Sequence, residues 1–379
     1  MWTFQTIWRF GLMTSDKEKH KILTQSYSTW GDKLLQHTDV LNSIQNEKKF
    51  KPITVQLCPC EVCDSDCPFC SVAGRPLKSY MKFEEITQVL NDFKDLGAKS
   101  LEITGGGNPM LYRDKETKKD INDIISYAKG LNYDVGVITN SHSLKNINEN
   151  SRELLSWIRI SLIQLDEGKN PEDYDFNGFP YEKLGFSYII YDSCDESPRR
   201  KKPYVGTSEA TIEKIAKLVE LHEGKIKFVR FAGNCLIRGN NSLVRKTFQQ
   251  LLDSNDKYKK FFLKTIDDDD GPFDDGCYVG MVRPYVAPSP EGNEYLVYTC
   301  TSHVLNKRTY DRNYSLCSIK DIKKTWNEMN QRYSQGLPPY QVNNNQGKCW
   351  EKTCSHCYYK FNNKLLHTVA NEMPDRNFA

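Results

Sequence analysis

The sequence lacks any apolar run long enough to cross a membrane. The segment 1–13 contains apolar residues, but it is too short and too interrupted to span a bilayer. It also lacks a basic n-region and a small-residue cleavage site, so we predict no signal peptide and no membrane partner. Met1 and Met13 are alternative natural starts.

A marked excess of one charge is missing as well. Lys and Arg number 52 against 49 Asp and Glu, which gives a formal net charge of +3. So small an imbalance produces no overall field toward nucleic acid or membrane surfaces, and nucleic-acid binding is not indicated. The one basic run, Arg199–Lys202, is predicted to be solvated surface.

Cysteine, by contrast, is abundant. The chain has 13 cysteines, an odd number that cannot be fully paired within one molecule. Five lie between Cys58 and Cys70, and five lie between Cys300 and Cys357. Such clusters favour metal ligation over a disulfide framework, and they predict a reducing, cytoplasmic setting.

The order of apolar segments predicts an α/β fold. The length of 379 residues exceeds the usual size of one hydrophobic core, so we expect a large domain and a smaller one. Six predicted strands alternate with helices and indicate a parallel sheet whose functional loops follow the carboxyl ends of the strands. The strands are expected at 53–57, 100–104, 134–139, 157–162, 185–191 and 226–231, and the helices at 83–96, 120–131, 144–155, 208–221 and 243–252.

Past this region the pattern changes. The acidic stretch 267–275 is predicted to be a linker, and a hairpin around 285–298 and a helix at 319–329 should follow it. We therefore predict a helical N-terminal extension (1–50), an α/β domain (51–265) and a small cysteine-rich α+β domain (266–379).

Three thiols follow the first predicted strand directly, in the pattern Cys63-x3-Cys67-x2-Cys70. Three thiolates are one fewer than a closed four-ligand iron-sulfur or zinc site uses, so a site built on them keeps an open position. A structural zinc site made by Cys60, Cys63, Cys67 and Cys70 is the alternative on spacing alone.

Two further features give this loop a context. Phe69 stands just before the last thiol, and the second strand is followed by Gly105-Gly106-Gly107-Asn108-Pro109. Together these features resemble the radical S-adenosylmethionine (SAM) superfamily, whose motif C-x3-C-x-aromatic-C follows the first strand of a partial (β/α)6 TIM-like barrel. The resemblance extends over roughly residues 51–235.

The resemblance implies a specific chemistry. Cys63, Cys67 and Cys70 would bind three irons of a [4Fe-4S] cluster, and the fourth iron would bind SAM. An electron donor such as flavodoxin or ferredoxin would reduce the cluster, and SAM would be cleaved to methionine and a 5'-deoxyadenosyl radical that abstracts a substrate hydrogen atom.

Further residues would contact SAM by the same resemblance. The glycine turn would receive the SAM amino group, although the family commonly has Glu where this chain has Asn108. Cys58 and Cys60 are expected to be non-ligating thiols beside the cluster. The expected cofactor-binding residues are Phe69, Gly105, Gly106, Gly107, Asn108, Asn140, Arg159, Ser161 and Val229.

The C-terminal cysteines resemble the SPASM or shorter twitch extension, which holds auxiliary iron-sulfur clusters. We expect one auxiliary [4Fe-4S] cluster, with four ligands drawn from Cys277, Cys300, Cys349, Cys354 and Cys357. A zinc knuckle that includes His356 is the alternative.

Resembling enzymes modify peptide or protein side chains by cross-linking, epimerisation or oxidation, and this is the expected function. A dehydrogenase or epimerase of a sugar, aminocyclitol or nucleotide is one alternative, and a non-catalytic zinc- or cluster-binding scaffold is another. Cys194 or Cys235 could return a hydrogen atom to a substrate radical.

Overall fold

The structure is a computed structural model that describes residues 31–176, 178–236, 258–264, 277–305, 307–340 and 359–371, with single positions between 246 and 252. Ten strands form one sheet in the order β10-β9-β8-β1-β2-β3-β4-β5-β6-β7. The strands are β1 (Thr54–Leu57), β2 (Ser100–Ile103), β3 (Asp134–Thr139), β4 (Trp157–Ser161), β5 (Leu184–Ile190), β6 (Val229–Gly233), β7 (Phe261–Lys264), β8 (Tyr285–Pro288), β9 (Tyr295–Tyr298) and β10 (Ser315–Ser318).

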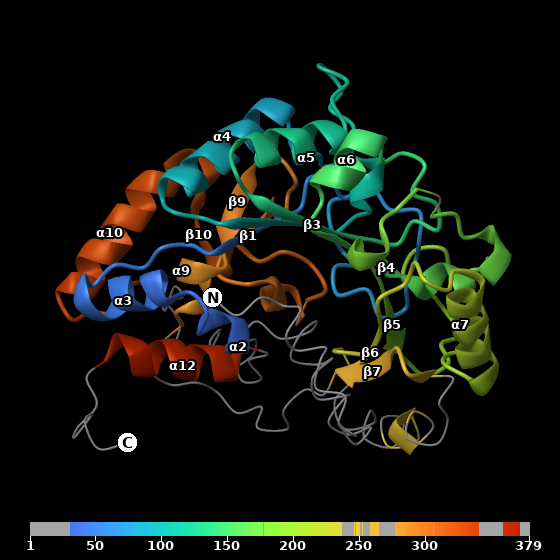
Figure 1. Ribbon diagram of the computed structural model, residues 1–379. Coiled ribbons are helices and arrows are strands. Elements are labelled where there is room, and N and C mark those ends of the chain that lie inside the picture. Colours follow the sequence, from blue (N-terminus) through green and yellow to red (C-terminus); the bar gives the residue numbers. More distant parts are fainter. Residues whose placement is uncertain are drawn as a thin grey trace.

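Seven consecutive strands, β1 to β7, run parallel and lie side by side in sequence order. The sheet curves, and helices α4 to α7 cover its convex side, while α2, α3 and α12 lie together on the other side (Figure 1). The helices are α2 (Gly31–Leu34), α3 (Thr38–Asn46), α4 (Phe83–Asp95), α5 (Ile121–Gly130), α6 (Glu149–Leu154), α7 (Glu209–Leu221), α9 (Val279–Val282), α10 (Ile322–Ser334) and α12 (Lys360–Ala370).

Alternation along the strands explains why the helices cover only one side. In β2 and β4 the apolar residues Leu101, Ile103, Ile158 and Ile160 are buried, while Glu102, Arg159 and other polar residues between them point the opposite way. The apolar face packs under amphipathic helices such as α4, whose buried residues are Ile86, Val89, Leu90 and Phe93. The concave face is thereby left polar.

The strands after residue 277 extend the same sheet. β8 pairs in parallel with β1, through Gln56 opposite Tyr285, and β9 and β10 follow in antiparallel order. The predicted hairpin is therefore confirmed, and it lies beside the strand that precedes the cysteine loop. The predicted division of the chain into domains stays a prediction.

The predicted α/β class and parallel sheet are confirmed, with two corrections. The sixth strand begins at Val229, three residues later than predicted. A seventh parallel strand, β7, was not predicted, because its four residues give too short an apolar run to stand out. The predicted linker at 267–275 and half of the helix at 243–252 lie outside the described residues.

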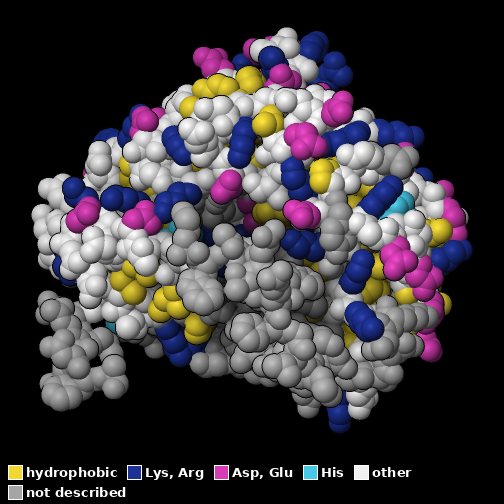
Figure 2. Space-filling view, viewed as in Figure 1, with side chains coloured by type: hydrophobic (Ala, Val, Ile, Leu, Met, Phe, Trp, Pro, Cys, Tyr) yellow, Lys and Arg dark blue, Asp and Glu magenta, His cyan; other side chains and the backbone are white. Residues whose placement is uncertain are grey.

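The surface agrees with the balanced composition. Lys and Arg are interspersed with Asp and Glu over the face seen in Figure 2. Within the described ranges, no helix is both long enough and apolar enough to cross a membrane.

Trp326 joins α10 to the convex layer and gives a test of the packing. Its side chain is fully buried, and its ring meets that of Phe93 edge-on at 5.2 Å between centroids. We expect Trp326→Ala to lower the free energy of unfolding by about 3–5 kcal/mol, because the lost contacts leave a cavity. Phe361→Ala, at a side chain that is 56% exposed, should change it by less than about 0.5 kcal/mol. Equal effects in urea unfolding would contradict this packing.

Candidate functional site

The predicted three-thiol loop occupies the carboxyl edge of the sheet, directly after β1. The backbone N–H of Cys70 donates to the carbonyl of Cys67 at 3.0 Å, which forms a tight turn between two of the thiols. Burial raises the pKa of the Cys67 thiol well above its usual value, and the charges of Cys70 and Cys63 raise it further. The three sulfurs are therefore close enough to repel one another as thiolates.

A set of three thiols fits a four-iron cluster by the chemistry of its donors. Among the described residues, no three His, Cys, Asp or Glu side chains are arranged to hold one metal ion. In a four-iron cluster each thiolate binds its own iron, so the sulfurs need to face a common centre without meeting at one point. Ligation would also remove the mutual repulsion, since bound iron stabilises thiolates.

Two arginines hold the end of this loop. Arg75 donates from Nη1 to Cys70 Sγ at 3.3 Å and from Nε to the carbonyl of Glu61 at 3.0 Å. Arg308 donates to the carbonyls of Pro68 and Cys70, both at 2.9 Å. Arg75 therefore places a buried positive charge beside one thiol, and a hydrogen bond to a ligand sulfur is a feature that tunes cluster potential.

The middle of the loop is fixed through Asp64. Its carboxylate accepts hydrogen bonds from the amides of Asn108 at 3.1 Å, Asn140 at 3.0 Å and Gln164 at 3.0 Å. These three amides follow β2, β3 and β4, so the ends of three neighbouring strands converge on one side chain. Asn140 also donates to Ser65 Oγ at 2.7 Å. Asp64 itself stays exposed, so its carboxylate is open to a ligand.

Asp66 provides a second anchor, to the loop after β5. Its carboxylate accepts from Arg199 Nε at 2.9 Å and from the backbone N–H of Arg200 at 2.6 Å. Burial alone would raise the pKa of Asp66, but hydrogen bonds from Ser197, Arg200 and Arg199 lower it to about 2. The prediction of a solvated basic run was wrong for Arg199, whose half-buried side chain holds the cysteine loop, while Arg200 is exposed as predicted.

The glycine turn is needed for a reason that the sequence did not reveal. A Cβ on Gly106 would overlap the carboxylate of Glu61 and the hydroxyl of Tyr310. A Cβ on Gly105, whose φ is +148°, would overlap Cys58. A Cβ on Gly107 would overlap the backbone of residues 60–62. The turn is therefore pressed against residues 58–62, and these glycines let β2 approach the start of the cysteine loop.

A buried carboxylate lies inside that contact. Glu61 Oε1 accepts hydrogen bonds from Cys58 Sγ at 2.9 Å and from the Tyr310 hydroxyl at 2.6 Å. Burial raises the pKa of Glu61 to about 7, even though Cys58, Tyr310 and Arg75 favour its charged form. Burial likewise raises the pKa of Cys58 well above its usual value and that of Cys60 to about 12.

The other predicted SAM contacts do not all lie at the carboxyl edge of the sheet. Ser161 ends β4 at the carboxyl edge, and Arg159 lies two residues earlier on the same concave face. The ring of Phe69 packs on Tyr191 at 5.0 Å between centroids. Val229 does not join them: it begins β6, its side chain is buried in the core, and its N–H donates to the carbonyl of Lys260.

The two candidate hydrogen donors also differ. Cys235 follows β6, and its thiol interacts electrostatically with Cys70 and Lys264, so it shares this edge of the sheet. Cys194 donates to the carbonyl of Glu196 at 2.9 Å within its own loop. The structure thus brings Cys235, rather than Cys194, toward the predicted cluster.

The C-terminal cysteines can be followed in part. Cys277 accepts from the Tyr340 hydroxyl at 3.0 Å, and Cys300 also acts on that hydroxyl, so the two thiols are neighbours. Thr301 bonds Tyr359 through their hydroxyls at 2.8 Å. Cys349, Cys354 and Cys357 lie outside the described residues, but Tyr359 is only two positions after Cys357.

Several site residues were missed from the sequence. Glu61, Arg75 and Gln164 carry no motif signal of their own, and only their contacts reveal them. One signal was available for Asp64 and Asp66: both stand between the first two thiols, where acidic side chains would face the polar residues at the neighbouring strand ends.

Comparison with known proteins gives the following findings. Residues 57–168 match the model of the radical SAM superfamily. No curated protein matches the chain. Among solved structures, Streptococcus suis SuiB bound to precursor peptide SuiA is 15% identical at a TM-score of 0.47, over 76% of this chain and 69% of that one.

Two more distant structures are similar to this chain as well. BtrN in complex with AdoMet and 2-DOIA is 12% identical at a TM-score of 0.40, over 82% of this chain and 94% of that one. The enzyme anSMEcpe with bound AdoMet is 14% identical at a TM-score of 0.43, over 86% and 97%. Likenesses this distant carry no argument about what this chain acts on.

The glycine contact gives a direct test of the site's architecture. Gly106→Ala should lower the free energy of unfolding by about 1–3 kcal/mol or more, because the added methyl group forces Glu61 and Tyr310 apart. Gly130→Ala is the matched control: nothing lies within 4 Å of its added Cβ, and Ala favours a helix by up to about 1 kcal/mol. If the two variants unfold at the same temperature, the close contact is absent.

Proposed function

Because residues 57–168 match the model of the radical SAM superfamily, we propose that the chain cleaves SAM reductively and abstracts a hydrogen atom from a second substrate. One observation carries the proposal: Cys63, Cys67 and Cys70 lie in one loop directly after β1, and residues from the ends of β2, β3 and β4 hold this loop in place. Three thiols leave one iron of a [4Fe-4S] cluster without a protein ligand.

When bound, the cluster would supply the electron that splits the SAM sulfonium into methionine and a 5'-deoxyadenosyl radical. The protein's part is to position both groups and exclude water. Arg75 and Arg308 would fix the cluster-binding turn, and the buried contact between Gly106 and Glu61 would close the site behind it.

Asp64 is the residue we propose for the SAM ammonium group. Position 108, commonly Glu in the family, is a fully buried Asn that bonds Asp64, Ser141 and Thr139. The exposed Asp64 carboxylate lies next to it and supplies the negative charge that Asn108 lacks. Ser161 and Arg159 remain the proposed contacts for the ribose and the SAM carboxylate.

For the second substrate we propose a peptide or protein side chain, which would be cross-linked, epimerised or oxidised. Cys235 is the proposed hydrogen donor for an epimerisation, since it lies toward Cys70. The neighbouring thiols of Cys277 and Cys300 support one auxiliary [4Fe-4S] cluster with the later cysteines. The free thiols fit a reducing cytoplasm, where flavodoxin or ferredoxin would be the electron donor.

Anaerobic reconstitution tests the reaction. Wild-type protein loaded with iron and sulfide and reduced in the presence of SAM should release 5'-deoxyadenosine. A variant with Cys63, Cys67 and Cys70 all replaced by Ala should release none and should keep about four irons per chain, the content of one auxiliary cluster. No 5'-deoxyadenosine from the loaded wild type would refute the proposed reaction, and no iron in the variant would refute the auxiliary cluster.

Asp64→Asn tests the proposed ammonium contact. Loss of a charge-assisted hydrogen bond should weaken SAM binding about tenfold, measured by equilibrium dialysis on cluster-loaded protein. Asp134→Asn changes an exposed carboxylate at the other end of β3, and SAM binding should stay as in the wild type. Unchanged SAM affinity in a fully loaded Asp64→Asn variant would exclude this role.

A further inference from the structure

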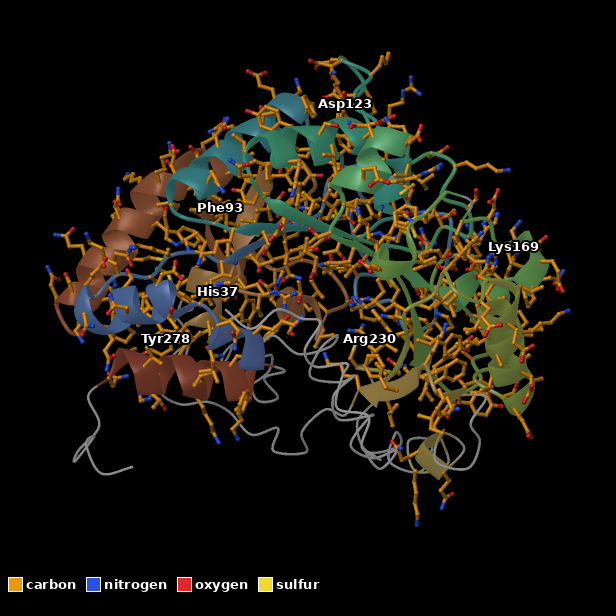
Figure 3. The ribbon with its side chains drawn as sticks, viewed as in Figure 1. His37, Phe93, Asp123, Lys169, Arg230 and Tyr278 are labelled. Carbon is orange, nitrogen blue, oxygen red and sulfur yellow. The ribbon has the colours of Figure 1, made fainter. Side chains whose placement is uncertain are left out.

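The concave face of the sheet carries a set of charged side chains that the proposed chemistry does not use in full. Strand register places them on one face: Gln56 lies opposite Glu102, Ser187 opposite Arg230, and Ala232 opposite Lys264. Figure 3 shows Arg230 on the side of the sheet away from α7. The ionisable members are Glu102, Arg159, Arg230, Lys264 and Arg283, from five different segments.

The charges of this set do not balance. Glu102 accepts from Gln56 at 2.7 Å and from Arg283 at 3.0 Å, so each of its oxygens already has a partner. Among the residues that the structure describes, it is the one carboxylate whose charge acts on Arg159 and Arg230. Lys33 of α2 adds another positive charge near Arg283. A surplus of positive charge is thus gathered on one inner face.

Two arginines of this set each have one nitrogen atom without a hydrogen-bond acceptor. The Nε atoms of Arg159 and Arg230 are buried and have no hydrogen-bond partner among the described residues. A buried donor without an acceptor is rare, although each side chain as a whole is only half-buried. Burial lowers the pKa of Arg230 well below its usual value and that of Lys264 to about 7, and neighbouring arginines add to both shifts.

We propose that Arg230 and Lys264 form a binding site for an oxyanion of the second substrate, a carboxylate or a phosphate group. This inference rests on the proposed function, because it assigns part of the substrate of that reaction. Arginine and lysine are the side chains that bind such groups through charge-assisted hydrogen bonds, which supply the acceptors that the buried Nε atoms lack.

The position of the pair suits a substrate of the radical reaction. Lys264 interacts electrostatically with Cys235, which in turn interacts with Cys70 in the cysteine loop. An anionic group held by Arg230 and Lys264 would therefore tether the rest of the substrate beside the predicted cluster. Arg159 can still serve the SAM carboxylate, since it lies on β4 and the pair lies on β6 and β7.

Calorimetry on cluster-loaded, SAM-saturated protein under anaerobic conditions tests the site. Inorganic phosphate and acetate are titrated separately, and one of them should bind. Arg230→Gln and Lys264→Gln should each weaken that binding about tenfold or more. Arg113→Gln changes an exposed arginine and should have no effect. Saturation with SAM keeps its own carboxylate from being mistaken for the site's ligand.

Thermal unfolding of an Arg230→Met variant shows whether a loss of anion binding is caused by misfolding. If Arg230 binds an anion of the substrate, this variant should be at least as heat-stable as wild type in anion-free buffer, because it removes a buried donor that lacks an acceptor. The bound anion should raise the unfolding temperature of the wild type but not that of the variant.

Two results would overturn the inference. The first is no binding of either anion to SAM-saturated wild type, and the second is equal binding by wild type and Arg230→Gln. Release of 5'-deoxyadenosine by the same wild-type preparation is scored separately, so failure of the anion site and failure of the proposed reaction are told apart.

Discussion

The hydrogen bonds to the Asp64 carboxylate are the constraint on which the rest of this site depends. Amides from the ends of three neighbouring strands meet on a side chain that stands between two cysteines. A short loop without such contacts would not hold three thiols in one place, because its backbone would lose conformational entropy by staying fixed. Tied to the sheet at Asp64 and to Arg199 at Asp66, the loop inherits the rigidity of the parallel strands.

Because side chains alternate along those strands, the two faces of the sheet have different roles. One set of residues buries apolar surface under α4 to α7 and supplies most of the stability. The other set makes the concave face polar, with Gln56, Glu102 and Arg159 on the first four strands and Arg230 and Lys264 on β6 and β7. Stability and chemistry therefore draw on opposite faces of the same strands.

The parallel strands and the cysteine loop were predictable because each depends on residues that are close together in the sequence. Six of the seven parallel strands followed from apolar periodicity, and the cysteine spacing identified the loop. Contacts between residues far apart in the sequence were not predictable. Nothing near Asp64 in the sequence indicates its contact with Gln164, one hundred residues away. Arg199, which binds Asp66, was predicted to be a solvated surface residue. The glycine turn was found at the right position, but its contacts with Glu61 and Cys58 could not be predicted from the sequence. Asn140, predicted from its strand end, does lie in the network.

The electron paramagnetic resonance spectrum of the reduced protein, recorded without and with SAM, tests the central claim most directly. The claim is that the loop anchored through Asp64 presents three thiols and leaves one iron open to SAM. To isolate this cluster, the spectra are taken on a variant with Cys277 and Cys300 replaced by Ala. The account predicts a [4Fe-4S] signal whose g-values shift when SAM is added. An identical signal in both spectra, or no cluster signal at all, would contradict it.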